Sequence, residues 1–155
     1  MNVSAPPSNR PWLARIGGLG VPGAIALLSA LGVFVSSVLL WLHYQSHSPL
    51  CTGVGSCQVV NASAYSEVMG LPVALLGLLM YGAILGLSLS LPGATAIVAL
   101  LGLALAGLLY SCYLTYVEVH ILRALCPWCL ASQGIIAAIF ALSLTLAPRA
   151  VSGER

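Results

Sequence analysis

The sequence contains no lysine and no aspartate, and charged residues of all kinds make up only 5% of its 155 positions. In a water-soluble domain roughly a quarter of the residues are charged. Here 60% of the residues are hydrophobic and the mean hydropathy is +1.06. The scarcity of charge excludes a soluble globular protein and favours a lipid bilayer as the environment. The five basic residues form no basic stripe, which argues against binding of nucleic acid.

Four long apolar runs each approach or exceed the roughly 20 residues that cross a bilayer as a helix. They cover residues 18–42, 71–91, 94–119 and 126–146. Pro92 and Gly93 separate the second run from the third, because a helix does not continue through this pair. The pattern predicts an all-α integral membrane protein, with residues 1–155 forming a single bundle of four transmembrane helices.

The first run follows Arg10 and Arg15, so a cleaved signal peptide is an alternative interpretation of this segment. The apolar core of a signal peptide is only ~7 to 15 residues long, and this run is longer. We therefore expect the segment to be retained as the first membrane helix.

The arginines predict the orientation, since short loops that carry Arg or Lys stay in the cytoplasm. If both ends of the chain are cytoplasmic, Arg123 is the one arginine of five that lies outside. The predicted topology has cytoplasmic tails at about 1–17 and 148–155. The protein is thus expected to cross the cell membrane several times. A long extracytoplasmic loop at about residues 44–70 then joins the first two helices.

Five cysteines are many for so short a chain, and disulfides persist only on an oxidising side of a membrane. Cys126 and Cys129 form a C-x-x-C at the outer start of the last helix. Residues three apart in a helix are neighbours, and a helix N-terminus favours the thiolate over the thiol. The motif favours a redox-active pair, with a static disulfide or half of a zinc site as alternatives.

Cys51 and Cys57 enclose a glycine-containing segment in the long loop, on the same predicted face as the C-x-x-C. Alone, this pair fits a structural disulfide as well as a redox-active one. Together, two pairs on one face can pass a disulfide from one to the other by thiol–disulfide exchange. Cys112 lies deep in the third apolar run, where we expect it to behave as a small buried hydrophobic residue.

The chain combines a loop cysteine, a serine six residues later and a C-x-x-C that opens the last helix. The positions involved, within residues 20–147, are 57–63, Tyr65, Gly70, Pro72, Gly77, Tyr81, 113–116 and 126–129. In this combination the sequence resembles the bacterial vitamin K epoxide reductase family.

The resemblance implies a four-helix bundle that encloses a quinone, such as menaquinone or ubiquinone, near the C-x-x-C. It implies that Cys51 receives electrons from a reduced partner and that Cys57 exchanges with Cys126. Cys129 would then face the quinone. The implied enzyme is a quinone-dependent thiol–disulfide oxidoreductase that supports disulfide bond formation in exported proteins.

Many bacterial relatives carry a fused thioredoxin-like domain, whereas this chain ends at Arg155. We therefore expect a stand-alone form whose electron donor is a separate thioredoxin-fold protein. Ser63 matches a family position near the site and is expected either to hydrogen-bond a thiolate or a quinone oxygen, or to cap a short helix. Gln133 stands where vertebrate members carry a tyrosine; quinone reduction is the expected activity, and reduction of vitamin K epoxide is left open.

Glu118 and His120 lie near the outer end of the third run. An ionisable group at membrane depth is a candidate for proton transfer, but we expect both residues to lie at the membrane interface.

Three other classes of protein fit parts of the sequence pattern. A cysteine-ligated metal-binding or transport protein would use the thiols as ligands, and a structural subunit would keep them as inert disulfides. The third class is the other quinone-linked family that generates disulfides. That family carries its C-x-x-C in the first external loop, whereas here the motif opens the last helix.

Overall fold

The structure is a computed structural model that describes residues 20–45, 59–60, 63–90 and 94–148. Cys51 and Cys57, and most of the predicted loop and tails, lie outside the described residues. The elements in chain order are α2 (Val21–Tyr44), η2 (Ala64–Ser66), β1 (Glu67–Val68), β2 (Leu71–Pro72), α4 (Val73–Leu89), α5 (Ala94–Tyr116), η3 (Val117–Leu122) and α6 (Pro127–Leu144).

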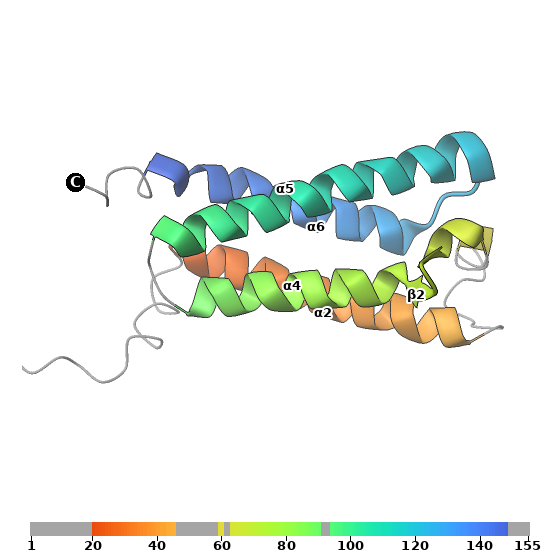
Figure 1. Cartoon of the computed structure of the whole chain (residues 1–155), viewed down its shortest axis with the longest axis horizontal. Helices are drawn as coiled ribbons and strands as arrows, with labels where there is room; N and C mark the ends of the chain where they lie inside the picture. The colour runs from red at the N-terminus through yellow and green to blue at the C-terminus, as the bar shows by residue number, and fades with distance from the viewer. Residues whose placement is uncertain (1–19, 46–58, 61–62, 91–93, 149–155) are drawn as a thin grey trace, which may run out of the picture.

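The four long helices run side by side along the molecule, as Figure 1 shows. Helix α2 packs against α4 and α6, and α5 packs against α6. Helices α4 and α5 contact each other more sparsely than the other neighbouring pairs. The predicted four-helix bundle is therefore confirmed, and its loosest seam lies between α4 and α5.

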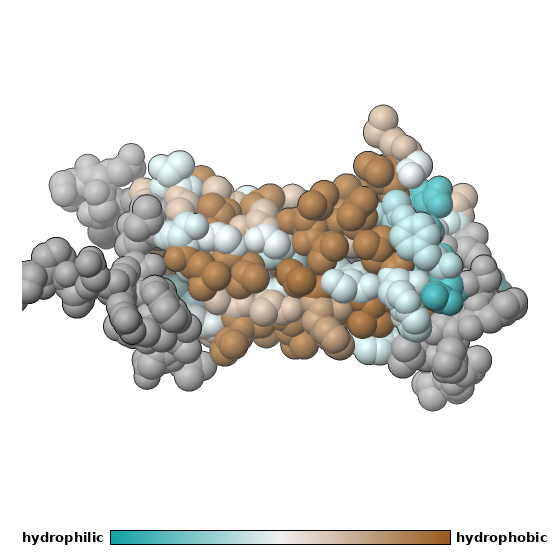
Figure 2. Space-filling view, turned by 90° about the horizontal axis from the view of Figure 1, so that it is seen from below, coloured by the Kyte–Doolittle hydropathy of each residue, from teal (hydrophilic) through white to brown (hydrophobic). Residues whose placement is uncertain are grey.

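The surface of the bundle matches a bilayer. Figure 2 shows hydrophobic residues over the middle of the molecule and hydrophilic ones gathered near one end. Among the described residues, three helical segments are long and apolar enough to cross a membrane, namely α2, α5 continued by η3, and α6. Helix α4 is equally apolar in character but has 17 residues, close to the shortest length that spans the hydrocarbon core.

A small β-hairpin precedes α4 and makes this helix shorter than the apolar run that predicts it. Strand β1 pairs with β2 in antiparallel register, with Val68 opposite Leu71. The two residues between them, Met69 and Gly70, both have positive φ, at 54° and 81°. Such a two-residue turn matches the twist of paired strands. The start of the second apolar run is thus used for strand pairing before the helix begins.

Tyr81 of α4 connects three helices at the centre of the bundle. Its side chain is 1% exposed. The ring lies against Gly32 of α2, where an added Cβ would be only 2.4 Å from a ring carbon. The hydroxyl donates a hydrogen bond of 2.8 Å to the carbonyl oxygen of Ser132 in α6. Glycine at position 32 is therefore what allows α2 and α4 to approach each other here.

The Gly32→Ala variant is expected to lower the free energy of unfolding by about 1 to 3 kcal/mol, the usual cost of an added methyl group in a packed core. Thermal unfolding in detergent measures the effect. Gly86→Ala in α4 is the matched control, because no atom lies within 4 Å of the added Cβ. Equal stability of the two variants would contradict the close packing of Tyr81 on α2.

Candidate active site

The C-x-x-C motif forms the first turn of α6, as the sequence predicts. Cys126 is the N-cap residue with extended backbone, and Pro127 occupies the first turn, where its missing N–H costs nothing. The Cys126 sulfur accepts a hydrogen bond of 3.4 Å from the backbone N–H of Cys129. Cys126 is fully buried, whereas Cys129 is partly exposed. The two sulfurs therefore lie on one turn, with Cys129 the more accessible.

A π-helical turn, η3, carries the chain from α5 towards this motif. It ends at Arg123, which has a left-handed backbone with φ of 48°, and the N–H of Ala124 donates to the carbonyl oxygen of Glu118 at 3.0 Å. Turns of this kind are often found at functional sites. The turn folds the chain back over Glu118. The backbone N–H of Cys126 therefore lies within hydrogen-bonding distance of the Glu118 carboxylate.

Glu118 lies inside the bundle, between its helices, and its predicted depth at the membrane interface stays a prediction. Its side chain is 2% exposed. Oε2 of the carboxylate accepts a hydrogen bond of 3.1 Å from the backbone N–H of Cys126. Glu118 and Cys129 also line the same two cavities of the bundle. His120, by contrast, is exposed and stacks on the ring of Tyr116, with 4.5 Å between ring centroids.

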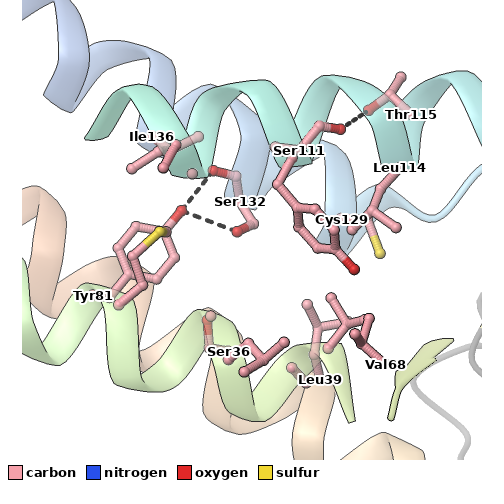
Figure 3. A pocket seen from close by; sticks show the side chains of 18 of the residues that line it. Ser36, Leu39, Val68, Tyr81, Ser111, Leu114, Thr115, Cys129, Ser132 and Ile136 are labelled. Atoms are coloured by element: carbon pink, nitrogen blue, oxygen red, sulfur yellow. Dashed lines mark hydrogen bonds between the residues drawn. The ribbon is translucent and has the colours of Figure 1, made fainter. Parts of the chain in front are cut away.

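A cavity of about 370 Å³ extends inward from Cys129 between the four helices. Most of its wall is apolar. The residues with polar side chains in the wall are Ser36, Tyr81, Tyr110, Ser111, Thr115, Glu118, Cys129 and Ser132. Figure 3 shows Tyr81 hydrogen-bonded to Ser132 towards one end of this cavity and Cys129 towards the other. Ser132 lies one helical turn from Cys129, and its hydroxyl oxygen is 3.0 Å from that of Tyr81.

A second, smaller cavity of about 60 Å³ shares Glu118 and Cys129 with the larger one and is also lined by residues of η2. Ser63, Tyr65 and Ser66 contribute polar groups to its wall. Ser63 is the N-cap residue of η2, but its side chain makes no capping bond and instead donates to the carbonyl oxygen of Val60 at 2.7 Å. The hydroxyl of Ser63 therefore lies at a cavity that Cys129 shares.

Cys112 and Gln133 lie outside the larger cavity. The amide nitrogen of Gln133 donates to the sulfur of Cys112 at 3.7 Å, and its oxygen accepts from Thr115. Cys112 is exposed on the surface of the bundle, so the expectation that it is buried is wrong. Helix α5 is apolar on its lipid-facing side as well as on its inner side, so an apolar position in this helix does not have to be a buried one.

The sequence analysis did not predict that Tyr81 and Ser132 lie in the wall of the larger cavity, or that Glu118 points into the bundle. Within the described parts of the chain, no group of three or more His, Cys, Asp or Glu side chains could hold a metal ion. The site as described consists of a C-x-x-C, a buried carboxylate and a largely apolar cavity.

Comparison with known families gives one match that covers most of the chain. The model of the vitamin K epoxide reductase family matches residues 23–144, from near the start of α2 to the end of α6.

Proposed function

The chain belongs to the vitamin K epoxide reductase family and is a multi-pass membrane thiol–disulfide oxidoreductase, and on that premise we propose its electron path. The protein oxidises a separate thioredoxin-fold protein and passes the electrons through two cysteine pairs to a quinone. The net result is disulfide formation in exported proteins. The observation that carries this proposal is the position of Cys129 in the wall of an apolar cavity within the membrane bundle.

The cavity fits a quinone head group in size and chemistry. Its volume of about 370 Å³ lies in the range of small-molecule sites, which are mostly apolar with a few convergent polar groups. Ala106 and Tyr110 of α5 line the cavity and are also exposed on the bundle surface. A lipid-soluble molecule can therefore reach the cavity from the bilayer through the sparse seam between α4 and α5.

The roles of the cysteines follow from their placement and from the family. Cys129 faces the cavity and reacts with the quinone, and Cys126 beside it completes the dithiol. Oxidation of this dithiol to a disulfide releases two electrons and two protons. The quinone takes the two electrons and takes up two protons from water to become a quinol. Cys57 then exchanges with Cys126, and Cys51 takes electrons from the partner. We propose that, when the Cys129 thiolate forms, the hydroxyl of Ser63 turns from its present acceptor, the carbonyl oxygen of Val60, and donates to this sulfur across the smaller cavity.

The orientation has both termini in the cytoplasm and the cysteine pairs on the extracytoplasmic face. Two features support it. Arg123 lies next to the C-x-x-C, whereas the other four arginines belong to the two ends of the chain. The C-x-x-C, η2 and the C-terminal end of α2 also lie at the same end of the bundle.

Ser132 is proposed to hydrogen-bond a quinone oxygen, because its hydroxyl lies one turn from Cys129 in the cavity wall. The Ser132→Ala variant is expected to raise KM for the quinone by about fivefold, the value of one hydrogen bond of about 1 kcal/mol. The kcat should change little, since the cysteines are untouched. A kcat that falls with KM unchanged would contradict a binding role for Ser132.

The proposed function is tested with purified protein in detergent, a reduced thioredoxin-fold protein as donor, and ubiquinone or menaquinone as acceptor. Quinone absorbance then measures the reaction. We expect steady reduction that depends on the donor and is lost when both Cys126 and Cys129 are replaced by alanine. Stoichiometric bound zinc or copper without any quinone reduction would favour the cysteine-ligated metal protein instead.

A further inference from the structure

We infer that Glu118 is a catalytic residue that accepts the proton of the Cys129 thiol when this sulfur reacts. The inference rests on the proposed function, in which Cys129 is the sulfur that reacts with the quinone. It extends that function by naming the group that receives the proton and the route by which the proton leaves.

The contacts of Glu118 suit this role. The carboxylate accepts the backbone N–H of Cys126 at 3.1 Å and lines both cavities together with Cys129. At 2% exposure it has almost no contact with solvent. Burying a carboxylate in an apolar bundle is costly, and such a residue is retained where proton transfer or binding needs it. No basic side chain of the described residues lines either cavity to neutralise it.

The titratable groups that share a cavity wall or a hydrogen bond with Glu118 come from four elements. They are the two thiols of Cys126 and Cys129 at the start of α6, and the phenols of Tyr65 in η2, Tyr81 in α4 and Tyr110 in α5. Two negative charges on side chains of the same small cavity wall repel strongly in a low dielectric. The carboxylate and the Cys129 thiolate are therefore not both charged, and the pair shares one proton.

The proposed step moves only a proton. The S–H bond of Cys129 breaks, an O–H bond forms on Glu118, and the sulfur keeps its electron pair for the reaction with the quinone. The smaller cavity of about 60 Å³ has room for water. The hydroxyl groups of Ser63, Tyr65 and Ser66 supply hydrogen-bond partners there. Water in this cavity takes the proton from Glu118 to the outer face and regenerates the carboxylate.

The variant that tests this step is Glu118→Gln. The amide oxygen still accepts the N–H of Cys126, so the start of α6 is kept, while the proton acceptor is lost. Quinone reduction is expected to fall by about 10²-fold at neutral pH, the lower end of what a general base contributes. The deficit should shrink as the pH is raised, because hydroxide replaces the missing carboxylate. Glu67→Gln is the control, since this exposed carboxylate lines neither cavity and pairs with His43.

A second readout does not involve the quinone. Methylation of the Cys129 thiol by a small uncharged reagent is followed by site-resolved mass spectrometry over a range of pH. In the natural protein the rate should level off once Glu118 has lost its proton. In Glu118→Gln it should keep rising, by about tenfold for each pH unit. If the protein failed to reduce quinone at all, the proposed function would be wrong while this test of Glu118 still stood.

Two outcomes would overturn the inference. One is the same pH profile of methylation in both proteins. The other is a loss of quinone reduction that is uniform across the pH range, as a purely structural role would give. If Glu118→Gln does not fold, as judged by thermal unfolding, Glu118→Asp replaces it. The shorter carboxylate should keep the levelled pH profile and lower the rate, and a profile that keeps rising would count against a carboxylate acceptor.

Discussion

Replacing Cys129 with alanine is expected to reduce quinone reduction to the background rate while Cys126 captures Cys57 in a stable mixed disulfide. The reason is that a mixed disulfide is resolved by a second thiolate, and Cys129 is the sulfur next to Cys126 on the same turn. Cys129 is also the sulfur in the wall of the larger cavity. Quinone absorbance measures the loss, and mass spectrometry of non-reduced peptides detects the trapped Cys57–Cys126 bond.

Two further variants make this result specific. Cys126→Ala should also lose activity but should trap no bond to Cys57, because the exchanging sulfur is gone. Cys112→Ala should keep its activity, since this thiol is exposed on the bundle surface and lines neither cavity. Quinone reduction at the normal rate in Cys129→Ala would show that another group delivers the electrons.

Narrowing the cavity is expected to separate the two half-reactions. In Ala106→Phe, a phenyl group is added in the cavity wall of α5 at an exposed position, where it disturbs no buried packing. We expect KM for the quinone to rise by about tenfold or more, equivalent to about 1.4 kcal/mol of binding free energy. The rate at which the oxidised protein oxidises the thioredoxin-fold donor in a single turnover should be unchanged, because the substitution alters none of the cysteines.

Ala99→Phe is the matched control for this variant. Ala99 is also an exposed alanine of α5, two turns earlier, and it lines neither of the two cavities. Its KM should remain that of the natural protein. If both variants behaved alike, or if Ala106→Phe had no effect, the quinone would bind elsewhere.

The helices could be predicted from the sequence because each apolar run is about as long as a bilayer is thick. The run at residues 94–119 begins where α5 begins, at Ala94. The run at residues 71–91 overestimates α4, because Leu71 and Pro72 pair with β1. Hydrophobicity alone does not distinguish a strand residue from the first residue of a helix.

The side chains were harder to place, since a membrane helix is apolar all round and its sequence does not mark which face is buried. For this reason Cys112 was expected inside the bundle and is exposed. The inward orientation of Glu118 was not predicted, because the π-helical turn to which it belongs has no clear sequence signature. Its isolation in an apolar run was the available signal. The bond between Tyr81 and Ser132 joins residues far apart in the chain and depends on helix packing.

The most direct test of the electron path is a single turnover. The protein, with Cys51, Cys57 and Cys112 replaced by alanine, is fully reduced, freed of reductant, and mixed with an equal amount of quinone. The account predicts one quinol for each protein molecule and the loss of both thiols, those of Cys126 and Cys129, as they become a disulfide. Both thiols remaining reduced, with no quinol formed, would contradict the claim that this pair passes electrons to a quinone.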